Sequence, residues 1–119
     1  MKICIIVSNF YPKISNMLIN GALKKLKKNK IKNPKIIKVP GTYEIPILLS
    51  AFAKKYVGFI VLGCIIKGET PHFNFLSSSV FRALTDLSVK NKIPIANGIL
   101  TCNNKKQAID RADINNKDK

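Results

Sequence analysis

One stretch of the sequence decides the fold: Gly58-Phe59-Ile60-Val61-Leu62-Gly63-Cys64-Ile65-Ile66, followed by Lys67-Gly68-Glu69-Thr70-Pro71-His72. An unbroken apolar run, without alternation of polar and apolar positions, is typical of a strand that is buried on both faces. Such strands belong to parallel sheets covered by helices on both sides. The glycine and proline that come next predict the end of this central strand and a loop leading into a helix.

Similar patterns on either side of this strand predict the remaining elements. Apolar, β-branched runs predict strands over residues 2–7, 35–39 and 93–101. Apolar residues at helical spacing predict a helix capped by Ser15, helices over residues 44–55 and about 72–90, and a last helix from Asn103 or Asn104 to Ala112. Four strands alternating with helices predict a single α/β domain over residues 1–119, a three-layer α/β/α sandwich around a four-stranded parallel sheet.

The charge of the chain is strongly basic, with 21 Lys+Arg against 6 Asp+Glu and a formal net charge of +15. A run of lysines without acids between Lys24 and Lys38 keeps a nucleic-acid binder open as a hypothesis. Arg82 and Arg111 are the only arginines, although base and phosphate recognition relies heavily on arginine. We favour a codon bias as the origin of the lysines, and we expect no nucleic-acid partner.

Hydropathy and cysteine usage predict a cytoplasmic protein. No segment comes near the roughly 18 consecutive apolar residues of a membrane-spanning helix, so no membrane partner is expected. Cys4, Cys64 and Cys102 are odd in number and lie in separate strand-like runs, which is typical of reduced, buried thiols. Because His72 is the only histidine, the sequence predicts no metal site.

The loop after the central strand carries the most chemistry. In a parallel sheet, ligands bind at the carboxyl ends of the strands. Gly68 permits close backbone approach there, and free amides at the start of the next helix suit an anion such as phosphate. His72 is a candidate proton-transfer residue, whereas a solitary histidine is more often a surface or packing residue. From the residues alone, both interpretations stay open.

The other loops at this edge allow two interpretations each. Glu44 either is a favourable acid in the first turn of a helix or accepts hydrogen bonds from sugar hydroxyls. Phe10 and Tyr11 either close the hydrophobic core at this edge by packing against it or provide an aromatic ring that stacks on a heterocycle. Arg111 either binds an anion through two hydrogen bonds from its guanidinium or is a solvated charge on a helix face beside Asp110.

Taken together, these loops resemble those of the lumazine synthase family of riboflavin biosynthesis. The resemblance is carried by Ser8-Asn9-Phe10-Tyr11, Val39-Pro40-Gly41-Thr42-Tyr43-Glu44-Ile45-Pro46, Leu62-Gly63-Cys64-Ile65-Ile66-Lys67-Gly68-Glu69-Thr70-Pro71-His72-Phe73, Asn97-Gly98-Ile99-Leu100-Thr101 and Gln107-Ala108-Ile109-Asp110-Arg111-Ala112. It implies a flavodoxin-like sheet and a transferase without cofactor or metal. The implied reaction condenses 5-amino-6-(D-ribitylamino)uracil with 3,4-dihydroxy-2-butanone 4-phosphate to 6,7-dimethyl-8-ribityllumazine, phosphate and water.

The resemblance also implies roles for individual residues. His72 would transfer protons, and Phe10 would stack on the pyrimidine ring. The ribitylaminouracil would be bound by Phe10, Thr42, Tyr43, Glu44, Cys64, Ile65, Ile66, Asn97 and Lys119. The phosphate would be bound by Gly68, Glu69, Thr70 and Arg111, the last of which would come from a neighbouring subunit.

Assembly and departures from the family pattern complete the expectations. The resemblance implies a homo-oligomer, a pentamer or an icosahedral shell of pentamers, with sites between subunits and riboflavin synthase as a pathway partner. Ser78-Ser79 replace the usual Asn-Glu pair, and Asn97 stands where many members have an aromatic ring. Family chains continue beyond Lys119 in a glycine turn and a final helix, so we expect a chain shortened at its C-terminus. The alternative hypothesis is a truncated homologue that only binds lumazine-like or flavin-like heterocycles.

Overall fold

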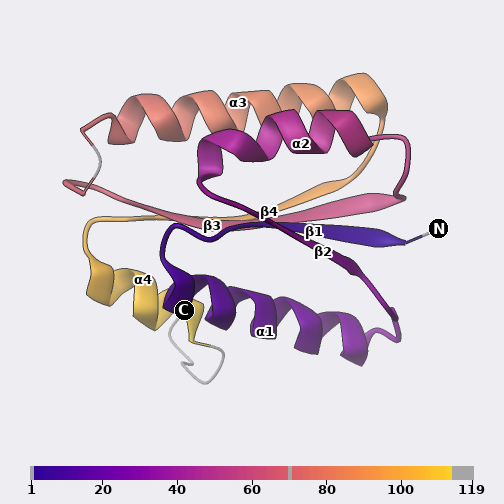
Figure 1. Cartoon of the computed structure of the whole chain (residues 1–119), viewed down its shortest axis with the longest axis horizontal. Helices are drawn as coiled ribbons and strands as arrows, with labels where there is room; N and C mark the ends of the chain where they lie inside the picture. The colour runs from indigo at the N-terminus through magenta and orange to yellow at the C-terminus, as the bar shows by residue number, and fades with distance from the viewer. Residues whose placement is uncertain (1, 70, 114–119) are drawn as a thin grey trace.

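The computed structural model describes residues 2–69 and 71–113, which form four parallel strands and the helices that cover them (Figure 1). The sheet has the order β2-β1-β3-β4, with strands β1 (Ile3–Ser8), β2 (Lys35–Val39), β3 (Gly58–Ile66) and β4 (Ile95–Cys102). β1 lies between β2 and β3, so that Ile3 faces Gly58 across the β1–β3 pair. The predicted four-stranded parallel sheet is therefore confirmed.

Helices cover both faces of this sheet. The α1 helix (Pro12–Lys28) and the α4 helix (Lys105–Ala112) lie on one face, and α2 (Ile45–Phe52) and α3 (Phe73–Asn91) lie on the other (Figure 1). A short 3-10 turn, η1 (Thr42–Glu44), leads directly into α2. This arrangement is the predicted three-layer α/β/α sandwich.

The core consists of two layers that meet at the sheet. Val61, Ile65 and Leu49 belong to the layer under α2 and α3, which also contains Val80 and Leu84 of α3. On the other face, residues of β1 and β3 pack against α1 and α4 in two further clusters. β3 contributes to both layers because successive side chains of a strand point to opposite faces. Its apolar run therefore fixes the sheet at the centre of the molecule.

Two helix boundaries differ from the sequence predictions. Ser15 does not cap α1: the helix begins at Pro12, and the Ser15 hydroxyl donates to the Ser8 carbonyl at 2.5 Å and the Tyr11 carbonyl at 3.0 Å. Proline has a fixed φ and no N–H group, so it suits the first helical position without a cap. The helix predicted over residues 44–55 is shorter and ends at Phe52.

The other predicted bounds agree to within two residues, the largest difference being β4, which begins at Ile95 and not at residue 93. Asn104 caps α4 by accepting a hydrogen bond from the Gln107 amide at 2.9 Å. Cys4, Cys64 and Cys102 are free, buried thiols, as the sequence predicted. Within residues 2–69 and 71–113, no helix combines the length and hydropathy that crossing a membrane requires.

Candidate active site

Three adjoining hollows lie where the strands end. The inner hollow, of about 150 Å³, is formed by the loops after β1, β2 and β3; its lining residues are Ser8, Phe10, Tyr11, Gly41, Thr42, Tyr43, Cys64, Ile65, Ile66 and Leu76. The chain adds β2 on one side of β1 and then adds β3 and β4 on the other side. The hollow therefore lies where the order of strand addition reverses, which is the position where open α/β sheets bind ligands.

His72 lies between two further hollows. The middle hollow, of about 320 Å³, is lined by Tyr43, His72, Phe75, Leu76 and Ser79. The outer hollow, of about 530 Å³, is lined by Lys67, Gly68, Pro71, His72, Phe73, Asn74 and Phe75. The middle hollow shares Tyr43 and Leu76 with the inner one, and His72 and Phe75 with the outer one. The imidazole therefore stands between the inner hollow and the turn that contains Gly68.

A close approach between β3 and η1 shapes the inner hollow. A Cβ atom on Gly63 would lie 2.9 Å from Cγ2 of Thr42 and 3.1 Å from Cβ of Ser8. Only glycine leaves this space, which lets the buried Thr42 pack directly on the sheet. The buried Ser8 hydroxyl has no hydrogen-bond partner among the residues that the structure describes. The hollow thus holds an unused hydrogen-bonding group in its wall.

The turn after β3 is held by backbone hydrogen bonds. The Lys67 amide donates to the Cys102 carbonyl at 2.8 Å, and the Glu69 amide donates to the Ile66 carbonyl at 3.3 Å. Gly68 has a φ of 87°, a left-handed conformation that favours glycine. His72 is exposed and precedes the first residue of α3, and its carbonyl accepts the Leu76 amide at 2.7 Å.

Tyr11 connects two of these loops through its side chain. Its hydroxyl donates to Oε2 of Glu69 at 2.7 Å, which joins the loop after β1 to the turn after β3. Its ring contacts the Phe10 ring edge to face, with centroids 4.9 Å apart. Burial, reinforced by the Glu69 carboxylate, raises the pKa of the Tyr11 hydroxyl well above its ordinary range. Tyr11 therefore stays protonated and can donate throughout the neutral range.

The sequence matches a known family along its whole length. The family model for 6,7-dimethyl-8-ribityllumazine synthase covers residues 1–119. The chain belongs to the lumazine synthase family. A 6,7-dimethyl-8-ribityllumazine synthase of Renibacterium salmoninarum is 36% identical over 96% of this chain and 72% of the relative. Those of Cutibacterium acnes and a Mycobacterium species are 35% and 38% identical over 96% of this chain, covering 69% and 71% of the relatives.

Most residues to which the lumazine synthase resemblance assigns a role lie in or beside the three hollows. Phe10, Thr42, Tyr43 and Cys64–Ile66 line the inner hollow, and His72 and Gly68 line the outer one. The Glu44 carboxylate lies against Gly41, where a Cβ atom would be 3.2 Å from Oε1. Thr70 and Lys119 lie outside the described residues.

Two residues with assigned roles lie elsewhere in the chain. Arg111 is exposed on α4 and donates to the Thr101 carbonyl at 3.2 Å and to Sγ of Cys102 at 3.6 Å. Asn97 is exposed on β4, and its side-chain oxygen accepts the Ile99 amide at 3.0 Å. Neither residue lines one of the three hollows.

The Cys64 thiol is poorly suited to nucleophilic chemistry. Burial, together with the neighbouring Cys102 and Glu69, raises the pKa of the Cys64 thiol to about 12 from an ordinary value of 9.0. The side chain packs with Cys102 and Ile14 on the α1–α4 face. Since the thiolate is the nucleophilic form, Cys64 contributes backbone and shape to the inner hollow.

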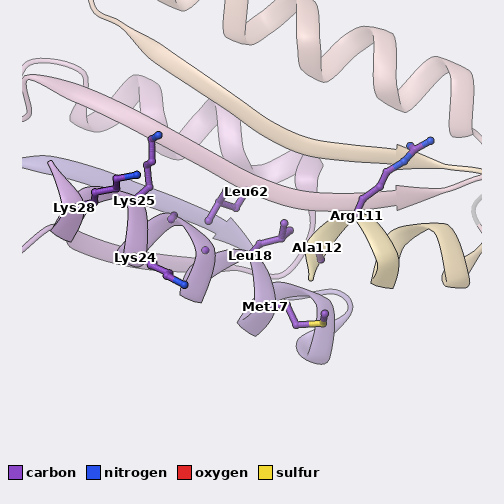
Figure 2. A pocket seen from close by; sticks show the side chains of 10 residues that line it. Met17, Leu18, Lys24, Lys25, Lys28, Leu62, Arg111 and Ala112 are labelled. Atoms are coloured by element: carbon purple, nitrogen blue, oxygen red, sulfur yellow. The ribbon is translucent and has the colours of Figure 1, made fainter. Parts of the chain in front are cut away.

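Another hollow lies on the α1–α4 face of the sheet. This groove between α1 and α4 measures about 450 Å³ and is lined by Met17, Leu18, Gly21, Ala22, Lys24, Lys25, Lys28, Leu62, Arg111 and Ala112. Figure 2 shows that its cations do not converge: the Arg111 side chain extends away from the three lysines, and Lys24 points away from Lys25. The groove therefore has an apolar floor and scattered charges at its rim.

Sequence reasoning missed Leu76, Phe75 and Ser79 as lining residues of the middle hollow. A signal for them existed, because positions three, four and seven after His72 share one face of a helix. Ser8 was missed as a possible partner for a ligand, although it is the one polar residue that ends an apolar strand. No local signal could have paired Tyr11 with Glu69, since they are 58 positions apart.

Proposed function

We propose that this chain condenses 5-amino-6-(D-ribitylamino)uracil with 3,4-dihydroxy-2-butanone 4-phosphate to 6,7-dimethyl-8-ribityllumazine, phosphate and water, using the three hollows described above. Membership of the lumazine synthase family supports this reaction. The proposal for the site depends above all on the position of His72, which lines both the middle and the outer hollow. A proton-transfer group between two binding regions is what a condensation of two substrates requires.

The inner hollow would bind the pyrimidine substrate. The Phe10 ring is 63% exposed, so one face is free to stack on a heterocycle. Backbone groups of Thr42, Tyr43 and Cys64–Ile66, which line the same hollow, would fix the ring by hydrogen bonds. Glu44 would accept hydrogen bonds from the ribityl hydroxyls, and Asn97 and Lys119 would contact the same substrate from other parts of the assembly.

The outer hollow would bind the phosphorylated substrate. The left-handed Gly68 would let the backbone approach the phosphate closely, together with Glu69 and Thr70. The Lys67 ammonium lines the same hollow and adds positive charge. Arg111 of a neighbouring subunit would clamp the phosphate with a planar fork of donors.

His72 would then move protons in successive steps. The 5-amino group attacks the ketone, and the resulting carbinolamine loses water to give an imine. Phosphate is eliminated with loss of a proton from carbon, and ring closure releases a second water. Each step needs proton transfer near neutral pH, where an imidazole can act as acid and as base. Holding both substrates in contact contributes much of the remaining acceleration.

We also propose that the working enzyme is a homo-oligomer, a pentamer or a shell of pentamers, in the cytoplasm. Ile47 of α2 is 74% exposed and Phe75 of α3 is 76% exposed. Both line hollows that contain Tyr43, so large apolar side chains gather on one side of the molecule. Exposed apolar groups that gather in this way are typical of subunit contacts. Riboflavin synthase would consume the lumazine product.

The decisive experiment compares His72→Ala with the wild-type chain. Lumazine formation from the two saturating substrates, followed by fluorescence, should slow on the order of a hundredfold without ceasing, because positioning remains. Lys54→Ala, at an exposed position, serves as the matched control and should retain full activity. A wild-type rate for His72→Ala would contradict the catalytic role. Lumazine binding by the wild-type chain with no turnover would instead support the binding-only alternative.

A further inference from the structure

The turn after β3 contains an acidic side chain close to the region proposed for phosphate. The acidic residue is Glu69, and Gly68 and Pro71, which lie on either side of it in the turn, both line the outer hollow. A free carboxylate at this position would repel a phosphorylated substrate, because like charges that approach each other raise the free energy of binding. The structure offers a way in which this repulsion is avoided.

The Glu69 side chain does not line the outer hollow. Its Oε2 instead accepts a hydrogen bond from the Tyr11 hydroxyl at 2.7 Å, and Tyr11 lines the inner hollow. A hydrogen bond to a charged acceptor is roughly twice as strong as one between neutral groups. Tyr11 is itself anchored, because it precedes the first turn of α1, packs with Ile14 and contacts the Phe10 ring.

We propose that Tyr11 is a positioning residue for the phosphorylated substrate, whose hydroxyl holds the Glu69 carboxylate away from the phosphate region of the outer hollow. This inference rests on the proposed function of that hollow. A tyrosine hydroxyl is protonated at neutral pH, and burial raises the pKa of Tyr11 further, so this hydrogen bond, the Tyr11–Glu69 latch, persists across the neutral range. The same ring supports Phe10 edge to face, so one side chain orders parts of both substrate regions.

The test is a double-mutant cycle with Tyr11→Phe, Glu69→Gln and the double variant in the full chain. Tyr11→Phe keeps the ring and frees the carboxylate, so KM for the phosphorylated substrate and the inhibition constant of inorganic phosphate should both rise about fivefold. The kcat and the KM of the pyrimidine substrate should stay within about twofold. Glu69→Gln removes only the side-chain charge and keeps the backbone of the turn. In the double variant the loss caused by Tyr11→Phe should therefore disappear, relative to Glu69→Gln alone, since a neutral amide does not repel the anion.

A matched control removes a different phenol hydroxyl. Tyr56 packs edge to face against Phe52 and Phe59, away from the three hollows, and Tyr56→Phe should leave all constants unchanged. If the Tyr11→Phe defect persisted in the double variant, Tyr11 would act through packing alone and the proposal would be wrong. An unchanged inhibition constant in Tyr11→Phe would overturn it as well.

The proposed function can fail separately from this inference. If the wild-type chain forms no lumazine, the proposed activity is wrong, and the titration of inorganic phosphate against the same variants still reports on the latch. Weaker phosphate binding in Tyr11→Phe, restored by Glu69→Gln, would then support the latch without the reaction. A wild-type chain that binds no inorganic phosphate would overturn the latch itself.

Discussion

The hollows at the strand ends and the groove between α1 and α4 differ in how their polar groups are arranged. The inner hollow is small, about 150 Å³, yet its wall contains the buried Ser8 hydroxyl, which has no hydrogen-bond partner within residues 2–69 and 71–113, and it adjoins the hollow lined by His72. The groove is larger, about 450 Å³, and is lined by three lysines and Arg111, whose side chains diverge (Figure 2). The number of cations alone would have selected the groove as the binding site, although the outer hollow, of about 530 Å³, is larger.

This difference shows which property of a hollow relates to chemistry. A binding site is recognised by a few polar groups that converge on a mostly apolar space. Loops after three strands supply such groups to the inner hollow, because the carboxyl ends of parallel strands meet at one edge. The α1 lysines are distributed along a helix surface, where each is solvated separately. Four changes test this contrast.

The largest effect is expected from an added methyl group under the inner hollow. Gly63→Ala would place a Cβ atom 2.9 Å from Cγ2 of Thr42, so η1 must move away from β3. Such overpacking destabilises a protein by about 1–3 kcal/mol, and we expect a lower urea midpoint together with lost activity.

The matched change in the groove should stabilise the chain, whereas Gly63→Ala should destabilise it. Gly21 lies in the middle of α1 and lines the groove, and Gly21→Ala should stabilise the chain by up to about 1 kcal/mol through helix propensity. Activity should not change. Equal effects of the two substitutions on activity would show that the two regions are not functionally distinct.

A smaller effect is expected at Cys64, which belongs to both sides of the contrast. Its backbone lines the inner hollow while its thiol packs with Cys102 on the α1–α4 face. Burial raises the pKa of the Cys64 thiol to about 12 and that of Cys4 to about 11, each from 9.0. Above about pH 9 the unfolded chain loses these protons while the folded chain keeps them, so the free energy of unfolding falls as pH rises.

Urea unfolding between pH 8 and pH 10 measures this dependence. Cys64→Ala should flatten the alkaline decline, and the kcat at pH 7 should change little because the thiol is not used. Cys102→Ala should flatten the decline less, since burial of the Cys64 thiol remains and only the part of its pKa shift caused by Cys102 is lost. A kcat that collapsed in Cys64→Ala, with unfolding unchanged, would assign chemistry to the thiol after all.

The smallest effect is expected in the groove itself. Lys24→Gln combined with Lys25→Gln removes two exposed cations from its rim. Because the side chains do not converge, KM for the phosphorylated substrate should stay within about twofold. Steady-state kinetics at low ionic strength provide the most sensitive measurement. A large rise in KM would place anion binding in the groove.

The sequence predicted the sheet more accurately than the helix ends. The bounds of β2 and β3 agree with the prediction, because a buried parallel strand has an apolar run with clear breakers on either side. Ser15 was wrong as a cap because its residue type suits caps, whereas tertiary contact directs its hydroxyl to the Ser8 carbonyl. Pro12 was the better signal for the start of α1.

Loop positions were predictable for the candidate site, whereas contacts between the loops were not. Topology alone places Phe10, Thr42 and His72 at one edge of the sheet. The contact of Thr42 with Gly63 and the hydrogen bond of Tyr11 to Glu69 depend on side-chain packing between distant segments. Residue types and spacing carry no information about such pairs without a structure.

The position of β1 between β2 and β3 has a consequence for synthesis of the chain. β1 is made first, yet one of its two partners follows only after α1, β2 and α2, since Ile3 pairs with Gly58. Closing so long a loop is entropically costly, and contacts of this kind form late in folding. The ribosome must therefore release β3 before the inner hollow, which Cys64, Ile65 and Ile66 help to line, can be completed. Until then the edge of β1 that pairs with β3 has unpaired backbone N–H and C=O groups, and such an exposed edge is prone to aggregate.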